Sequence, residues 1–196
     1  MTAVTLRADT LERMVRAVQA VEERLLRSCR ALEAGGVPYA VIGGNAVAAW
    51  VAQKDEGAVR NTRDVDILIR REDLPWAIAA MEAVGFVHAH VTGVDLFIDG
   101  PNGKPSQGVH LLFAGEVVRE KDELPTPTLD EVTAGPRFRL VSLEALLRMK
   151  LTSFRDKDRT HIRDLIGVGL IDATWAERFP PVLADRLREI LADPDG

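Results

Sequence analysis

Two aspartates separated by a single residue, Asp64 and Asp66, are the part of the sequence best suited to chemistry. Along an extended strand, side chains two residues apart project from the same face, about 7 Å apart at the backbone. Their carboxylates can therefore converge on one or two hard divalent cations such as Mg²⁺. The same spacing also arises by chance on exposed strands, so the pair needs support from its surroundings.

A glycine pair upstream supplies that support. Gly43 and Gly44 follow the short apolar run from Tyr39 to Ile42 and precede the small-residue stretch 45–53, which favours a helix. Because glycine has no side chain, phosphate oxygens can approach free backbone N–H groups and the positive end of the helix dipole. A glycine pair is also an ordinary turn. The combination predicts a strand, a glycine turn, a helix and then a second strand that carries the acids.

The elements that position these residues follow from hydrophobic periodicity. Apolar residues recur three or four apart over 9–34, which predicts one long amphipathic helix that ends at glycines. Alternating or continuous apolar runs bounded by turn residues predict strands. The expected strands are 39–42, 64–69, 86–91, 94–98 and 109–113, and the expected helices are 9–34, 45–53, 73–83, 143–154, 158–166 and 181–192.

The predicted fold class is α/β in the broad sense that includes α+β. Strands and helices together indicate a mixed β-sheet core with flanking helices, followed by a C-terminal helical subdomain. The stretch from Gly115 to Arg137 is rich in proline and predicts an extended connection or flap. The expected organisation is an N-terminal helix packed on the core at 1–36, the core at 37–140 and the helical subdomain at 141–196.

The composition is typical of a cytoplasmic globular protein. Of the 196 residues, 46% are hydrophobic and 28% are charged. A single cysteine, Cys29, excludes an intramolecular disulfide, and no apolar run approaches the roughly 20 residues that span a bilayer. The net charge of -5 argues against a protein that coats nucleic acid. Local contact would have to use the mixed-charge stretch 148–163, which is equally typical of a solvated helix face.

The segments VIGGNAVAAW and RNTRDVDILI resemble the nucleotidyltransferase superfamily of polymerase-β-like fold. Within that superfamily the chain is similar to a small bacterial branch near the AbiEii-type toxins and minimal nucleotidyltransferases, and the likeness continues more weakly through LEALLRMKLTSFRDKDR. The resemblance implies a metal-dependent enzyme that transfers NMP from an NTP to a hydroxyl of RNA such as tRNA, of a protein or of a small molecule. A toxin-like or regulatory role would fit that branch.

The resemblance also assigns roles to individual residues. It implies that Asp64 and Asp66 bind the metals, with Mg²⁺ expected and Mn²⁺ as an alternative, and that Gly43 and Gly44 hold the triphosphate. Asn45 stands where serine is common, and its amide either donates to a phosphate or caps the helix. The other candidates for binding the nucleotide are Thr62, Lys150 and Asp158, with Arg155 and Lys157 as helpers.

Lys150 is the candidate with the clearest signal of its own, because it interrupts an apolar helical stripe. It either reaches the cleft and pairs with phosphate as a catalytic residue, as the corresponding lysine does in the toxin-like branch, or extends to solvent. Asp158 either matches the acid that follows this lysine in the related motif or caps a helix before Ile162, and Asp164 is a weaker alternative.

The third metal-binding carboxylate is where the sequence departs from the superfamily. In the segment GVHLLF the expected position is held by His110, whose imidazole is a poor ligand for Mg²⁺ and suits Mn²⁺ or softer metals better. Asp95 on the neighbouring strand could supply the acid in a different register. His110 is otherwise a general base for the acceptor hydroxyl or an ordinary strand histidine. We expect His88 and His90, which share a strand face, to lie at the surface.

Two functions stay open at this point. The first is a metal-dependent nucleotidyltransferase, and the second is a catalytically impaired module of the same fold that binds a nucleotide and acts through a protein partner. Substitution of a carboxylate by His110 favours the second. The motifs name neither the NTP nor the acceptor, and the long N-terminal helix could pair across a homodimer as readily as pack on its own sheet.

Overall fold

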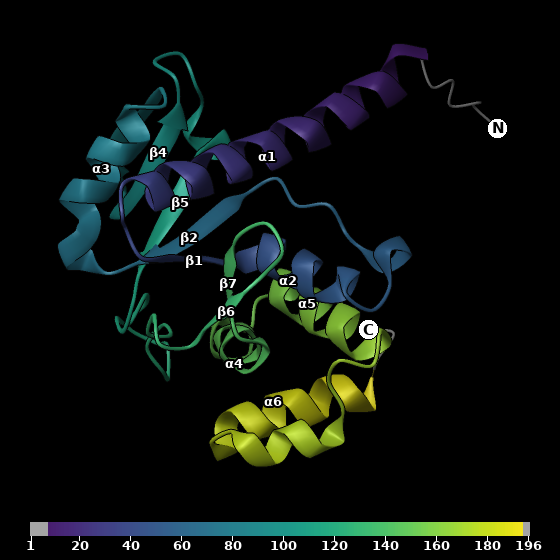
Figure 1. Ribbon diagram of the computed structural model, residues 1–196. Helices are drawn as coiled ribbons and strands as arrows, with labels where there is room; N and C mark the ends of the chain where they lie inside the picture. Colours follow the sequence, from purple (N-terminus) through teal and green to yellow (C-terminus); the bar gives the residue numbers. More distant parts are fainter. Residues whose placement is uncertain (1–7, 194–196) are drawn as a thin grey trace.

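The structure of the protein, a computed structural model that describes residues 8–193, has one seven-stranded mixed sheet between two groups of helices (Figure 1). The strand order is β3-β4-β5-β2-β1-β7-β6. β1 runs parallel to β7 and β2 parallel to β5, while the other neighbours are antiparallel. The strands are β1 (Tyr39–Ile42), β2 (Val65–Ile69), β3 (Phe86–Val91), β4 (Val94–Asp99), β5 (Val109–Phe113), β6 (Val132–Ala134) and β7 (Arg139–Val141).

Six α-helices and four short 3₁₀ turns complete the described chain. The α-helices are α1 (Ala8–Ala34), α2 (Gly43–Ala52), α3 (Leu74–Glu82), α4 (Leu143–Ser153), α5 (Asp156–Gly167) and α6 (Pro181–Ala192). The 3₁₀ turns are η1 (Glu56–Ala58), η2 (Arg71–Asp73), η3 (Pro105–Gln107) and η4 (Ala173–Arg178). The predicted fold class is confirmed, and each predicted helix and strand has a counterpart. The strands β6 and β7 were not predicted, because three residues are too few to show an alternating pattern.

One face of the sheet is covered by α1 and α3, which pack against each other. The C-terminal half of α1 buries Leu25, Cys29 and Leu32 there. The guanidinium groups of Arg24 and Arg27 form ion pairs with the carboxylate of Asp99 at the end of β4. The N-terminal half of α1 continues past the sheet (Figure 1), and its large apolar side chains Leu11, Met14, Val15 and Val18 are exposed.

The other face is covered by helices that continue directly from two neighbouring strands. β1 leads into α2 at Gly43, and β7 leads into α4 through Ser142, whose Oγ accepts a hydrogen bond from the backbone N–H of Ala145. The indole N–H of Trp50 on α2 donates to the carbonyl of Val141 on β7 at 3.1 Å. Because α5 and α6 pack on α4, a continuous buried apolar cluster joins the sheet to both groups of helices.

The stretch 115–137 was predicted to be an extended connection. Its residues 115–131, between β5 and β6, have no regular structure and are called the flap, whereas residues 132–134 form β6. The hydroxyl of Thr126 donates to the carbonyl of Phe113 at 2.5 Å, which fixes the flap to the end of β5. The guanidinium group of Arg119, also in the flap, donates to the carbonyl of Ser153 at 3.2 Å. The flap is therefore tied both to the sheet and to the end of α4.

Two further expectations concern the environment of the protein. Among the helices of residues 8–193, none has both the length and the apolar composition needed to cross a membrane. Cys29 is buried as a free thiol, and burial raises its pKa to about 12.

The division of the chain at residues 36 and 140 stays a prediction.

Candidate active site

The predicted acid pair lies at the start of β2, beside the N-terminus of α2. Asp66 is in the strand, whereas Asp64 precedes its first residue. In the strand register, Asp66 lies between Ile42 of β1 and His110 of β5. The side chains of Asp64 and Asp66 are 42% and 23% exposed, so both carboxylates remain accessible to a ligand.

Gly43 and Gly44 form the first turn of α2 rather than a turn before it, which shifts the predicted helix start by two residues. Gly43 has a φ of +68°, and a Cβ at this position would lie 2.1 Å from Oδ2 of Asp66. A Cβ on Gly44 would lie 2.7 Å from Oγ1 of Thr62. Glycine is therefore required at both positions, since the backbone of α2 passes against the acid strand and the segment before it.

Replacing Gly43 by alanine is expected to lower the free energy of unfolding by about 1–3 kcal/mol, because of the positive φ. It should also displace the Asp66 carboxylate and reduce nucleotide binding. Chemical denaturation and calorimetric titration with an NTP measure the two effects. Gly167→Ala is the matched control, because no heavy atom lies within 4 Å of its added Cβ. Equal stability of the two variants would contradict this account.

Asn45 and Thr62 both lie near the acid pair. The side-chain amide of Asn45 donates to the carbonyl oxygen of Asp64 at 2.7 Å. This contact engages one of the two N–H donors of the amide, so donation to a phosphate stays a prediction. The amide does not cap α2, because the cap residue is Ile42. Thr62, in contrast, lines the cavity that contains both acids.

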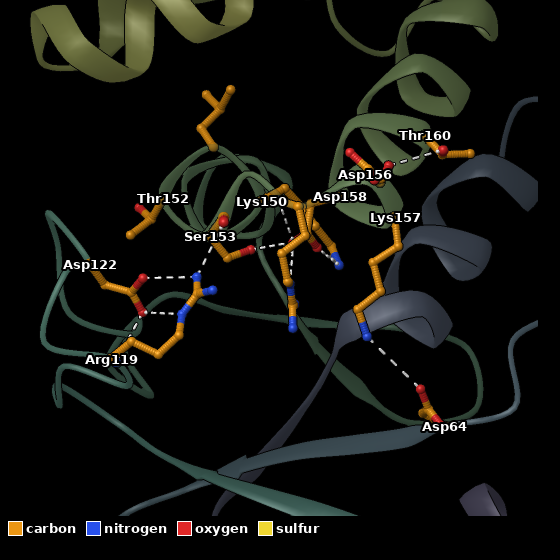
Figure 2. Close-up of polar contacts among 12 residues, drawn as sticks. Asp64, Arg119, Asp122, Lys150, Thr152, Ser153, Asp156, Lys157, Asp158 and Thr160 are labelled. Atoms are coloured by element: carbon orange, nitrogen blue, oxygen red, sulfur yellow. Dashed lines mark hydrogen bonds and ion pairs between the residues drawn. The ribbon is translucent and has the colours of Figure 1, made fainter. Parts of the chain in front are cut away.

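The cavity in front of the acids has a volume of about 490 Å³ and is closed by α4, α5 and the flap. Cationic side chains line much of it: Arg63, Arg119, Lys150, Arg155 and Lys157. Nζ of Lys157 lies 4.0 Å from Oδ2 of Asp64 across the opening (Figure 2). The cavity thus combines two accessible carboxylates, a helix N-terminus and several cations, which suits a polyanionic ligand that carries metal ions.

Lys150 and Asp158 form a buried ion pair in the wall of the cavity, with Nζ 2.9 Å from Oδ1 (Figure 2). Their side chains are 7% and 0% exposed, so Lys150 does not extend to solvent. The other oxygen of Asp158 accepts from Nε of Arg155 at 2.8 Å and from the hydroxyl of Ser153. Asp158 is therefore saturated by protein donors and supports Lys150 rather than facing the ligand directly.

The pKa values of both side chains in this ion pair are shifted by burial and by their neighbours. Burial alone would raise the pKa of Asp158, but Arg155, Lys150 and Ser153 together hold it well below its ordinary value. For Lys150, burial lowers the pKa by more than the attraction of Asp158 raises it. The weaker candidate Asp164 lies apart from this pair and binds Nε of Arg60 at 2.7 Å.

His110 lies beside Asp66 on the neighbouring strand, at the position where the sequence resemblance implied a third carboxylate. Its Nδ1 lies 3.6 Å from Oδ1 of Asp66, and this carboxylate raises the pKa of His110. Within residues 8–193, no group of three histidine, cysteine, aspartate or glutamate side chains is arranged to hold a metal. The candidate metal ligands thus remain Asp64 and Asp66, with His110 beside Asp66 as the possible third ligand.

The alternative in which Asp95 completes the metal site is wrong, because Asp95 lies on the opposite face of the sheet. Leu96 pairs with His110, and His110 pairs with Asp66, so these three share a face and Asp95 points away from it. The Asp95 carboxylate instead contacts Nε2 of His88 at 3.0 Å and Nδ1 of His90, two strand histidines that lie beside it.

Several cavity residues were not identified from the sequence, notably His161 on α5 and the flap residues Arg119 and Asp122. Arg119 and Asp122 form an ion pair at 2.8 Å (Figure 2). No sequence signal marks these residues, because their place in the cavity depends on how the flap and α5 fold over β2. The hydrogen bonds of Ser153 to Asp158 were missed for the same reason.

Comparison with known proteins identifies the fold. No protein-family model and no curated protein sequence matches the chain. Among solved structures, the chain is similar to the antibiotic-resistance factor ANT(2'')-Ia, with a TM-score of 0.51 and 16% identity over 92% of this chain and 94% of that one. It is also similar to an antigenic nucleotidyltransferase-like protein from Paracoccidioides brasiliensis, with a TM-score of 0.56 and 20% identity over 90% of each chain. The chain therefore has a nucleotidyltransferase fold.

Proposed function

We propose that the protein is a metal-dependent nucleotidyltransferase that transfers NMP from an NTP to an acceptor hydroxyl. The proposal rests mainly on the close contact between Gly43 at the start of α2 and Asp66 on β2. Both residues line one cavity, together with Lys150 and Lys157. The nucleotidyltransferase fold supports it, and so do the cations around the acids.

The residues fit divalent cations of the hard, oxygen-binding kind. Asp64 and Asp66 present accessible carboxylates to one cavity, and a triphosphate in that cavity would add further oxygen ligands. Mg²⁺ is the proposed ion, and Mn²⁺ is the alternative because His110 adjoins Asp66. When bound, such ions neutralise the triphosphate and lower the pKa of the attacking hydroxyl.

The protein would mainly bind and orient the reactants. The free N–H groups of the first turn of α2 would donate hydrogen bonds to phosphate oxygens, as helix N-termini commonly do. Lys157, which is 55% exposed, can turn from Asp64 towards the charge that develops on pyrophosphate. A bond forms between the acceptor oxygen and the α-phosphorus, the bond to the pyrophosphate oxygen breaks, and the hydroxyl proton passes to solvent.

The acceptor and the biological role are proposed more broadly. RNA such as tRNA, a protein side chain and a small hydroxylated molecule all remain candidates, and the similarity in fold to an antibiotic-resistance factor is a reason to include small molecules. The finer placement near the AbiEii-type toxins, with a toxin-like or regulatory role in the cytoplasm, rests on sequence resemblance. The buried contact between Lys150 and Asp158 supports a shared role for these two residues of the motif.

A second candidate function is a module that binds a nucleotide without turning it over. The observation in its favour is His110, which stands beside Asp66 where a carboxylate would complete the metal site. Such a protein would act through a partner, and a homodimer is one form of partnership that the exposed end of α1 would permit.

A labelled-nucleotide assay separates the two functions. The protein is incubated with each labelled NTP in Mg²⁺ and then in Mn²⁺, together with tRNA, total cell protein or a panel of hydroxylated small molecules. We expect pyrophosphate release and transfer of label to one acceptor class. The Asp64→Asn, Asp66→Asn double variant is the control and should give neither. Tight NTP binding without release in any mixture would favour the non-catalytic module, and lack of binding would contradict both.

A further inference from the structure

His161 is a cavity residue for which the proposed reaction has no use so far. It lies on α5, one turn after Lys157, and its side chain lines the same cavity as the acid pair. Residues four apart on a helix have their Cβ atoms about 6 Å apart on one face. Lys157 lies next to Asp64, so the backbone of His161 lies about one helical turn from a residue that contacts the acid pair.

The ring of His161 lacks a polar partner among residues 8–193. Its Nδ1 is buried from solvent and forms no hydrogen bond. The other buried side-chain atoms without a hydrogen bond belong to Arg24, Arg27 and Asp164. Arg27 and Asp164 each form an ion pair through another atom, and Nε of Arg24 itself lies 3.5 Å from Oδ2 of Asp99. A buried polar group without a partner destabilises the fold, so an unpaired ring in a ligand cavity calls for an explanation.

The charge of His161 narrows the kind of ligand that it can bind. Burial, assisted by the charge of Lys150, lowers the pKa of His161 to about 4. The ring is therefore neutral near pH 7, with one N–H donor and one acceptor nitrogen. A neutral ring adds no charge for a phosphate, and a base with so low a pKa is a weak proton acceptor for the acceptor hydroxyl. The ligand group that suits this neutral ring is an uncharged one that can both donate and accept a hydrogen bond.

We infer that His161 recognises the nucleoside half of the NTP, as a specificity-determining residue that exchanges hydrogen bonds with an uncharged group of the sugar or the base. The inference rests on the proposed function, which puts the triphosphate at Gly43 and the acid pair. A nucleoside joined to that triphosphate would occupy the rest of this cavity, whose lining includes His161.

Calorimetric titration tests this with two kinds of ligand. Non-cleavable α,β-methylene analogues of the four NTPs carry a nucleoside, whereas inorganic tripolyphosphate carries only the phosphates. We expect His161→Leu to weaken binding of the preferred NTP analogue about tenfold, as for one lost hydrogen bond, and to leave tripolyphosphate binding unchanged. His161→Asn, which keeps a donor and an acceptor, should restore part of the affinity.

Further arms of the experiment identify the group and exclude unfolding. Loss of discrimination against 2'-deoxy analogues assigns the contact to the sugar, and loss of discrimination among the four bases assigns it to the base. His90→Leu removes a histidine on the opposite sheet face and should change neither affinity. The melting temperature of His161→Leu should not fall, because the substitution removes a buried polar group without a partner.

Two results would overturn the inference while leaving the proposed function in place. One is an unchanged affinity of His161→Leu for every NTP analogue, and the other is an equal loss for NTP analogues and tripolyphosphate, which would indicate a change in cavity shape. If the wild-type protein binds neither ligand, the proposed function fails, and the inference fails with it.

Discussion

Asp66→Asn is expected to slow NMP transfer by about 10³-fold while the protein stays folded. The substitution keeps the size of the side chain but removes the charge that holds a cation, and metal ions supply several kcal/mol of transition-state stabilisation, with each ~1.4 kcal/mol worth a factor of ten. Asp64→Asn should act in the same direction. Pyrophosphate release measures the rate, and thermal denaturation checks the fold.

The matched control for the acid pair is Asp130→Asn. Asp130 is exposed on the flap, does not line the cavity, and should keep wild-type activity. Both site variants should stay folded, because the carboxylates are partly exposed and lie 4.0 and 3.6 Å from their charged partners Lys157 and His110. An Asp66→Asn enzyme within tenfold of the wild-type rate would remove the acids from the proposed mechanism.

The second large effect is on stability, at the buried ion pair. Asp158→Asn is expected to lower the free energy of unfolding by about 3–5 kcal/mol, because it leaves the ammonium group of Lys150 buried without a counter-charge. Lys150→Met is the informative comparison. In that variant Asp158 keeps its contacts with Arg155 and Ser153, so stability should fall less while nucleotide transfer still drops. Denaturant titrations of both variants, with the transfer assay, measure the difference.

The Asp158 prediction carries a pH dependence of definite sign. The folded-state pKa of Asp158 lies below its ordinary value of about 4, so its charge stabilises the fold above that pH and loses this effect as the pH falls towards the folded value. The gap in unfolding free energy between wild type and Asp158→Asn should therefore shrink below about pH 4. A gap that widens in acid would contradict the assigned ion pair.

The parts of the site that the sequence predicts are those that local geometry determines. Gly43, Gly44 and the strand that carries Asp66 lie within one strand, helix and strand unit, so their spacing predicts their proximity. The hydrogen-bond partner of the Asn45 side chain, in contrast, does not follow from local geometry. The sequence leaves open whether its amide faces a phosphate or the helix, and only the tertiary approach of Asp64 shows that it binds a backbone carbonyl.

Strand register and contacts between residues far apart in the chain could not be predicted from the sequence. Asp95 and His110 were both candidates for a third ligand, and the choice between them depends on which residue of β4 pairs with His110. A shift of one residue exchanges the two faces of a strand, so no local pattern decides it. Similarly, Lys150 and Asp158 were each identified from the motif, but their mutual contact depends on how α5 folds back onto α4.

The adjacency of β1 and β7 also determines how a ligand can enter. Val41 pairs with Leu140, and the two strands continue within a few residues into α2 and α4, which carry the glycine turn and Lys150. Both walls are thus extensions of one strand pair. The flap has no such continuity, and side-chain contacts such as those of Arg71 with Glu116, Arg119 with Ser153 and Arg148 with Glu131 attach it to the rest. Under the proposed function, release of these contacts would open the cavity for entry of the NTP and release of pyrophosphate.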